Sequence, residues 1–243
     1  MASPRIWQHA IVLTGALLLT PLSPDGSRSA WGQAASSVPA LSPVAASWLE
    51  KWQLEASEAR ATRAKTEVGL TGFNRLVPAA ALDRRLREGV TELMKSDVPP
   101  TERGQVLRAM FAVISAVDRE NTEILRANLP ATGWFVDTAI ASDAWLIAQH
   151  SSDRELQKEV LGRLERTARA GAFNGWEYAR LYDRLELFQG RPQRYASQAR
   201  CISGTWSFGE VPSEQEVERQ RAVIGWTESL EQTKMRLNIG APC

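Results

Sequence analysis

The segment LDRRLREGVTELM at residues 82–94 carries the clearest structural signal in the chain. Its apolar side chains recur at the spacing of one helix face, at Leu82, Leu86, Val90, Leu93 and Met94. Its charged side chains fall opposite that face, at Asp83, Arg84, Arg85, Arg87 and Glu88. This pattern predicts an amphipathic helix that packs against a core and turns its charges to water.

Helical periodicity continues on both sides of this segment. Upstream, it predicts a helix over about 44–68, followed by a loop at 70–78. Downstream, Pro99 and Pro100 end the amphipathic helix and precede a long helix that opens at Thr101. The N-terminal half of the ordered chain is therefore predicted to consist of three long helices.

The rest of the chain is predicted to add shorter helices. Ser152 and Glu155 are spaced as a capping box, in which a hydroxyl and a carboxylate satisfy backbone donors at a helix start. The segment 191–212 differs, because proline, glycine and β-forming residues alternate in it. The other predicted helices cover 135–149 and 176–188, with a turn at 171–175, and one or two C-terminal helices are predicted over 213–224 and 227–237.

These patterns predict a mainly α protein. We expect an irregular helical bundle with at most a short β-hairpin or structured loop near 191–212. No internal repeat is visible at the periods of solenoid proteins. The length suits one helical domain that covers residues 44–243.

The first 34 residues have the order of regions found in a secretory signal peptide. Arg5 precedes an apolar run at 10–22, and small polar residues follow. Residues 35–43 are expected to form a flexible leader. A membrane anchor is the alternative, but a spanning helix needs about 20 apolar residues, and Pro21 breaks this shorter run. We expect export to the periplasm or the extracellular space, without stable membrane insertion after cleavage.

The mature chain would be electrically neutral. Cleavage removes Arg5, Asp25 and Arg28, which takes 29 basic and 28 acidic residues to 27 of each. This balance argues against nucleic acid as a partner, because phosphate binding needs basic side chains in excess. In an exported chain, the two cysteines, Cys201 and Cys243, are expected to form a disulfide, with two free thiols as the alternative.

Histidine is scarce in this sequence. His9 lies in the predicted signal peptide, which leaves His150 in the mature chain. Because both cysteines are expected to pair, a zinc site built from histidine and cysteine is excluded, and we expect no metal and no cofactor. Phosphate-binding loops and nucleophile elbows are absent from the sequence as well.

His150 ends a predicted helix, two residues before the capping box. In one interpretation it is a general base or proton shuttle, oriented by Asp153, Asp183 or a tyrosine. In the other it caps carbonyl groups at the helix end, where the helix dipole favours a protonated ring. Asp183 and Arg184 leave a similar choice open: they bind substrate, or they belong to a solvated helix face.

Several short motifs follow one another in the second half of the chain. They are Gly133-Trp134-Phe135, Gln149-His150-Ser151, Asp183-Arg184 and the run Gly190-Arg191-Pro192-Gln193-Arg194-Tyr195-Ala196-Ser197-Gln198. Their order resembles an uncharacterised, largely bacterial family, domain of unknown function 6624, whose pattern runs roughly GWP, QHA, DR and G-x-P-Q-x-YGTQ. The resemblance covers about residues 95–230, with Asp118 and Asn121 upstream and Arg221 and Gly225 downstream.

The resemblance implies that polar residues from a helix end, a helix and a loop line one site. The residues concerned are His150 and Asp183 as catalytic groups and Arg184, Gln193, Tyr195 and Gln198 as substrate-binding groups. The family supplies no reaction, since none is assigned to it. The chain departs from the pattern at Phe135, at Ser151 and at Ala196-Ser197, and loss of a glycine at 196 is expected to change the turn before Gln198.

Two hypotheses of function follow. The first, which the missing catalytic signatures and the single histidine favour, is a binding or interaction module that holds a peptide, glycan or protein ligand through the 190–212 loop and exposed aromatic side chains. Most of the seven tryptophans of the mature chain are expected in the core, and several are candidates for a ligand groove. The second is a hydrolase-like enzyme with His150 as base and Asp183 as its orienting partner.

Overall fold

The computed structural model describes residues 40–169 and 175–243. The predicted signal peptide at 1–34 lies outside the described residues, as do most of the leader at 35–43 and most of the turn at 171–175. The described part contains eight α-helices and one two-stranded antiparallel sheet. The predicted mainly α fold is therefore confirmed.

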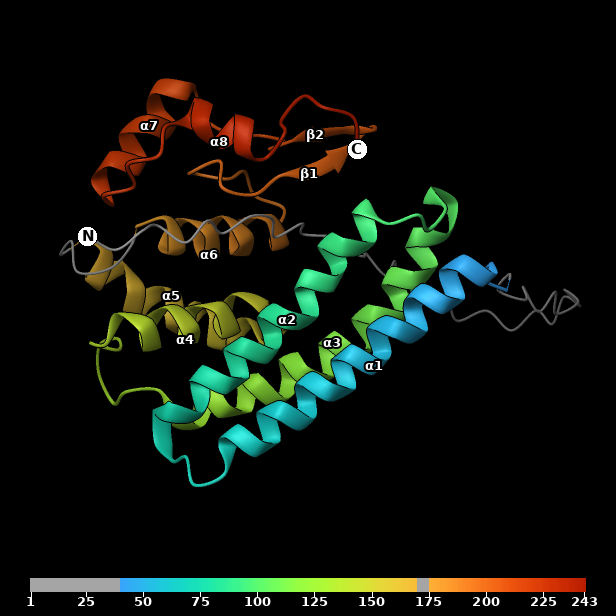
Figure 1. Cartoon of the computed structure of the whole chain (residues 1–243). Coiled ribbons are helices and arrows are strands. Elements are labelled where there is room, and N and C mark those ends of the chain that lie inside the picture. Colours follow the sequence, from blue (N-terminus) through green and yellow to red (C-terminus); the bar gives the residue numbers. More distant parts are fainter. Residues whose placement is uncertain (1–39, 170–174) are drawn as a thin grey trace, which may run out of the picture.

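Three long helices lie side by side in the N-terminal half (Figure 1). They are α1 (Pro43–Glu67), α2 (Leu76–Lys95) and α3 (Pro100–Asn128), and the short 3-10 helix η1 (Gly72–Arg75) precedes α2. The start of α2 lies inside the predicted loop at 70–78, so that boundary is wrong. Pro78 sits in the first helical turn, where its missing N–H costs nothing.

The apolar stripe of α2 packs between α1 and α3, as predicted. Its leucines and Val90 are buried with Trp52 of α1 and with Val106, Met110, Ile114 and Val117 of α3. Gly89 allows the indole of Trp52 to approach α2 closely, because a Cβ on Gly89 would lie 2.1 Å from the Nε1 of Trp52. The packing of α1 on α2 therefore depends on a glycine within a helix.

A second group of helices consists of α4 (Thr138–His150), α5 (Arg154–Arg169) and α6 (Gly175–Phe188), and it packs on α2 and α3 through α4 (Figure 1). Its helices and the ends of α2 and α3 share one apolar core. The start of α4 lies three residues after the predicted one. The carboxylate of Asp137 fixes it by accepting from the backbone N–H groups of Ala139 and Ile140.

The start of α5 also differs from the prediction. The Leu156 N–H donates to Oδ1 of Asp153 at 2.9 Å, so Asp153 caps this helix. The predicted capping box of Ser152 and Glu155 is wrong, because Asp153 caps the helix instead and the Glu155 carboxylate pairs with Lys158. This cap directly follows the end of α4 at His150, so the corner between the two helices is short.

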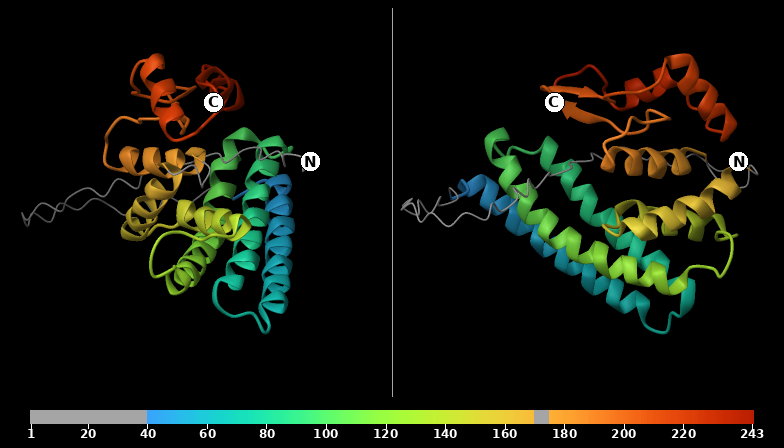
Figure 2. Two further views of the ribbon diagram at one scale, coloured as in Figure 1. Left: turned by 90° about the vertical axis from the view of Figure 1, so that its left-hand side faces the viewer. Right: turned by 180° about the vertical axis from the view of Figure 1, so that it is seen from behind.

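The C-terminal segment forms a unit beyond α6, on the side away from α1 (Figures 1 and 2). Strands β1 (Arg200–Ile202) and β2 (Thr205–Ser207) form the hairpin predicted within 191–212, and α7 (Glu214–Val223) and α8 (Leu230–Arg236) follow. Cys201 in β1 pairs with Cys243, which confirms the disulfide. The bridge spans 42 positions and stabilises the fold by about 4 kcal/mol in the chain-entropy model.

Arg221 of α7 is fully buried and joins the C-terminal unit to the loop before the hairpin. Its Nε donates to the Tyr195 carbonyl at 2.9 Å, and its Nη2 donates to the Ala196 carbonyl at 3.1 Å. Its Nη1 donates to the Thr233 hydroxyl at 2.9 Å, and the ring of Trp226 lies 3.8 Å from the guanidinium carbon. These partners satisfy a charge that would otherwise be costly to bury.

The described tryptophans serve the core, as predicted for most of them. Four are buried and three are partly buried: Trp52, Trp134, Trp145 and Trp226, then Trp48, Trp176 and Trp206. Phe73 and Phe188 are exposed. No helix of residues 40–169 and 175–243 has the length and apolar character that a membrane span requires.

Candidate functional site

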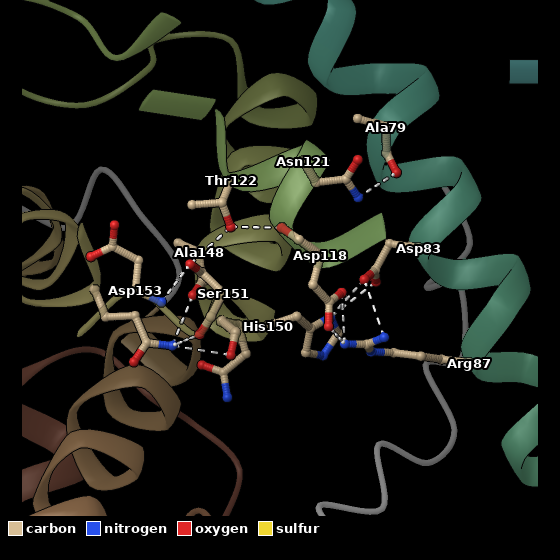
Figure 3. Close-up of polar contacts among 12 residues, drawn as sticks. Ala79, Asp83, Arg87, Asp118, Asn121, Thr122, Ala148, His150, Ser151 and Asp153 are labelled. Carbon is tan, nitrogen blue, oxygen red and sulfur yellow. Dashed lines mark hydrogen bonds and ion pairs between the residues drawn. The ribbon is translucent and has the colours of Figure 1, made fainter. Parts of the chain in front are cut away.

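His150 is the last residue of α4 and turns its ring toward α2 (Figure 3). Its Nδ1 lies 2.9 Å from Oδ2 and 3.1 Å from Oδ1 of Asp83. The Asp83 side chain is 1% exposed and that of His150 is 11% exposed. A buried carboxylate on the neighbouring helix therefore orients the ring, while a small part of the His150 side chain remains exposed.

Charge states follow from these surroundings. Burial alone would raise the pKa of Asp83, but His150 and Arg87 together hold it below its ordinary value. Burial and the charge of Arg87 lower the pKa of His150 to about 4, although Asp83 opposes this. Above about pH 4 the ring is neutral. Because a donor must face the ionised carboxylate, we assign the proton to Nδ1 and the lone pair to Nε2.

Arg87 links Asp83 to a second carboxylate, which comes from α3. Its Nη2 donates to both oxygens of Asp118 at 3.0 Å, and its Nη1 lies 3.4 Å from Oδ1 of Asp83. Burial raises the pKa of Asp118 to about 6, against the effect of Arg87, and the charge of Asp83 adds to the rise. We call His150, Asp83, Arg87 and Asp118 the His150 centre.

Side chains behind the ring fix this corner (Figure 3). The Thr122 hydroxyl donates to the Asp118 carbonyl at 2.6 Å and lies 2.9 Å from the Ser151 hydroxyl. The buried Gln157 amide donates to the Ala148 carbonyl at 3.0 Å and to the Ser151 carbonyl at 2.9 Å. These bonds join α3, α4 and α5, so the His150 ring is held by the scaffold and not by a loop.

Two further arginines lie beside the His150 centre. The charge of Arg184 on α6 contributes to the low pKa of His150. Burial lowers the pKa of Arg184 itself to about 9, and the charges of Arg154 and other arginines add to this. Both guanidinium groups contact the ring of Phe188, with carbons 3.3 Å (Arg154) and 5.5 Å (Arg184) from its centre. Among the described residues, neither arginine forms an ion pair.

Asp183, next to Arg184 in sequence, belongs to a different network. It is fully buried, and its two oxygens accept three backbone N–H groups, from Arg194 at 2.8 Å, Tyr195 at 3.1 Å and Ser197 at 2.9 Å. Burial raises the pKa of Asp183 to about 6, against the effect of these bonds. This carboxylate holds the loop that leads into the hairpin.

The other residues implied by the motifs lie in that same loop network. Gln193 donates to the carbonyls of Gln198 at 2.8 Å and Phe208 at 2.6 Å, and accepts from the Gln198 N–H at 2.8 Å. The Gln198 side chain donates to the Arg180 carbonyl at 3.1 Å. Tyr195 is buried in the apolar core. Ala196, where the family pattern has glycine, adopts a φ of 50°, which is the left-handed conformation that glycine reaches most easily.

The structure therefore divides the predicted site into two groups. His150 and Arg184 lie together on one side of α6, and Asp183, Gln193, Tyr195 and Gln198 surround the loop on the other. The carboxylate that orients His150 is Asp83, in place of the predicted Asp183, whose oxygens are already occupied by backbone donors. The Asp183 carboxylate, the Gln193 amide group and the Gln198 amide nitrogen are hydrogen-bonded within the fold.

Asp83 and Arg87 were absent from the predicted site, because they read as part of the charged face of their helix. One signal was available: Asp83 precedes Leu86 by three positions and Val90 by seven, which is the spacing of a shared helix face. A carboxylate at the edge of an apolar stripe, four residues before an arginine, is a candidate for a buried pair.

The His150 centre offers acid and base groups. Its neutral imidazole is a base above about pH 4, and Asp118 exchanges a proton near pH 6. In the part of the chain that the structure describes, no three histidine, cysteine, aspartate or glutamate side chains are grouped so as to hold a metal ion.

Comparison with known proteins places the His150 centre in a family. The model described as Family of unknown function (DUF6624) matches residues 73–239, which is more than half of the chain. The match begins upstream of the predicted 95, so it includes Asp83 and Arg87 as well as His150. No curated protein and no solved structure matches. The chain belongs to the Family of unknown function (DUF6624).

Proposed function

We propose that this chain is a hydrolase-like enzyme in which His150 is the general base and Asp83 orients it. The observation that carries the proposal is the contact of His150 Nδ1 with the buried Asp83 carboxylate, at 2.9 Å and 3.1 Å. A neutral imidazole held in this way by an ionised carboxylate presents Nε2 as a proton acceptor. Scaffold helices fix both residues, as acid–base catalysis requires.

In the proposed reaction, Nε2 of His150 takes a proton from water while the water oxygen bonds to an electrophilic carbon or phosphorus atom. The bond from that atom to the leaving group breaks, and the leaving group takes a proton from Asp118. Asp118 suits this role because burial raises its pKa to about 6, so that a fraction is protonated near neutrality. Transfer of the proton from His150 to Asp118 then restores both groups.

The binding-module hypothesis receives less support from the described residues. The tryptophans that were candidates for a ligand groove are buried or partly buried. Gln193 and Gln198, which the motifs implied as ligand contacts, donate their side-chain N–H groups to backbone carbonyls. Asp83 takes the orienting role that was predicted for Asp183. Asp83 contacts His150, whereas the Asp183 oxygens accept backbone N–H groups of the loop.

Nuclear magnetic resonance of the imidazole nitrogens tests the base directly. The chain has two histidines, so the His150 signals are identified by comparison with His150→Asn. We expect a neutral ring with the proton on Nδ1 at neutral pH, because burial lowers the pKa to about 4 and Asp83 faces Nδ1. A ring that is protonated at neutral pH, or that carries its proton on Nε2, rules out the proposed base.

Turnover tests the reaction. We expect the protein to hydrolyse at least one member of a panel of nitrophenyl carboxylate and phosphate esters. His150→Asn keeps an amide nitrogen near the Nδ1 position but has no base, and should lose about 100-fold or more in kcat. Asp83→Asn should lose activity through the wrong tautomer, while the exposed Ser152→Ala should not change it. Equal activity in wild type and His150→Asn contradicts the proposal.

We also infer that the chain works outside the cytoplasm. The Cys201–Cys243 disulfide supports this, because such bonds persist mainly in oxidising compartments. Mass spectrometry of the protein recovered from a periplasmic or culture fraction should give an N-terminus near residue 35. An intact N-terminus on protein confined to the cytoplasm contradicts the inference.

A further inference from the structure

We propose that Arg184 and Arg154 form an oxyanion-binding subsite beside His150, so that the molecule bound there carries a phosphate or carboxylate group. The proposal rests on the function proposed above only in identifying the bound molecule with the substrate of the enzyme. Binding of the anion itself is independent of any turnover.

Charge is unbalanced at this point of the molecule. Arg87 is shared by two carboxylates, Asp83 and Asp118. Arg154 and Arg184 have no carboxylate partner within 4 Å in the described ranges. The three guanidinium groups therefore outnumber the two carboxylates, and protonation of Asp118 increases the excess of positive charge. Like charges brought together out of water repel, and an anion between them relieves that repulsion.

The two unpaired arginines are held in place by the fold. Arg184 is partly exposed, but its Nε is buried and has no hydrogen-bond partner in the described chain. Arg154 packs on the ring of Phe188, and its Nη1 donates to Oε1 of Gln157 at 2.6 Å. Guanidinium groups that are already ordered lose little freedom on binding, and their forked donors match carboxylate and phosphate oxygens.

The subsite also bears on the strength of the base. The charged groups that act on His150 are Asp83 and Arg87 from α2 and Arg184 from α6, with Asp118 of α3 paired to Arg87 and Arg154 of α5 beside Arg184. The charges of Arg87 and Arg184 oppose protonation of the ring. A bound anion offsets them, so His150 becomes a stronger base when a ligand is present.

Isothermal titration calorimetry of the protein with inorganic phosphate and with succinate, at constant ionic strength, tests the subsite. We expect at least one of the two anions to bind. Arg184→Gln should weaken that binding by about tenfold or more, because it removes a charge-assisted donor pair. Arg184→Lys keeps the charge without the fork and should fall between the two. Arg108→Gln, at an exposed position of α3, is the matched control and should bind as the wild type does.

The contrary results are equally definite. Failure of both anions to bind the folded wild type at millimolar concentration overturns the subsite, and so does equal affinity in wild type and Arg184→Gln. Thermal unfolding without ligand shows that each variant is folded before it is titrated. A second readout is the pKa of His150 by nuclear magnetic resonance, which should rise when the anion is added and should stay constant in Arg184→Gln.

The subsite and the enzymatic proposal fail separately. His150→Asn should retain anion binding while it loses hydrolysis. If anions bind but His150→Asn hydrolyses esters as the wild type does, the subsite stands and the base is wrong. If hydrolysis depends on His150 but Arg184→Gln binds anions normally, the base stands and the subsite is wrong.

Discussion

Two consecutive residues of α6 serve different networks, because neighbouring side chains on a helix point in directions about 100° apart. Asp183 holds the loop at 194–197, and Arg184 lies beside the His150 centre. A motif read from sequence as one unit, Asp-Arg, is thus two units in space. The assignment of both residues to one site followed from the family resemblance and not from their contacts.

Removal of the Asp183 carboxylate should destabilise the protein strongly. Asp183→Ala leaves three buried N–H groups, those of residues 194, 195 and 197, without acceptors. We expect a loss of about 3 kcal/mol or more in the free energy of unfolding, measured by urea denaturation. Asp97→Ala, at an exposed aspartate, is the control and should change it by less than about 0.5 kcal/mol. Similar midpoints for the two variants would show that the loop does not depend on Asp183.

At the residue scale the sequence singled out His150 and Arg184, which lie near each other in the fold, but not Asp83, the carboxylate that contacts His150. Asp83 was placed on a solvated face because four charged residues share its helix turn and the next one. Burial of one charge among several depends on which neighbours cover it, and here α4 covers position 83 with His150. Such pairing between segments 67 positions apart is invisible to local periodicity.

At the scale of elements, glycine inside a helix has two different consequences in this chain. Gly89 of α2 lies against Trp52, and a Cβ there would meet the indole at 2.1 Å. Gly162 of α5 has open space where its Cβ would be. Substitution of alanine at Gly89 and at Gly162 therefore compares the same change with and without a close neighbour.

Gly89→Ala should lose about 1 to 3 kcal/mol of stability, because overpacking exceeds the gain in helix propensity. Gly162→Ala should gain up to about 1 kcal/mol, because only the propensity changes. Chemical denaturation of both variants measures the contrast. Stabilisation by both substitutions would mean that Trp52 moves aside freely, and that the close packing of α1 on α2 is not required.

The elements themselves were largely predictable, and their ends were less so. All eight helices of the described part and the hairpin fall within or near predicted segments. The errors at α4 and α5 share one cause, because in each an aspartate, Asp137 or Asp153, captures the first N–H groups. The backbone conformation of the residues before a helix decides which of two neighbouring residues caps it. Hydrophobic periodicity in the sequence does not report that conformation.

At the scale of the whole molecule, the His150 centre joins α2, α3 and α4, and its titration should affect global stability. Asp118 has a pKa of about 6 in the folded chain, above its ordinary 3.8, so the folded chain keeps a proton that the unfolded chain releases. Its stabilising contribution is lost as the pH rises from about 4 to about 6. His150, with a folded pKa of about 4 against 6.5, contributes stability that is gained over nearly the same window.

Two variants separate these opposed effects. Asp118→Asn removes the falling contribution, so its free energy of unfolding should rise more steeply with pH than that of the wild type. His150→Asn removes the rising contribution, so its slope should be lower than that of the wild type. Each difference should approach about 1.4 kcal/mol per pH unit. Contributions from Asp183 and Glu177 are common to all three proteins, and parallel stability curves would contradict the assigned pKa values.

The arrangement of the whole molecule was the least predictable level. The mainly α fold and the disulfide followed from composition and spacing, whereas the packing of α6 between the His150 centre and the loop at 193–198 did not. A shared site for the motif residues assumed that residues of one pattern serve one purpose. The single domain predicted from residue 44 stays a prediction.

Arg221 gives the C-terminal unit an attachment that protons do not govern. Its donors meet carbonyl oxygens and a hydroxyl, and its face meets an indole; none of these partners titrates at physiological pH. The guanidinium keeps its charge there too. Acidification therefore leaves the bonds of Arg221 unchanged. The same loop is sensitive to pH on its other side, because burial raises the pKa of Asp183 to about 6 and its carboxylate accepts the loop N–H groups.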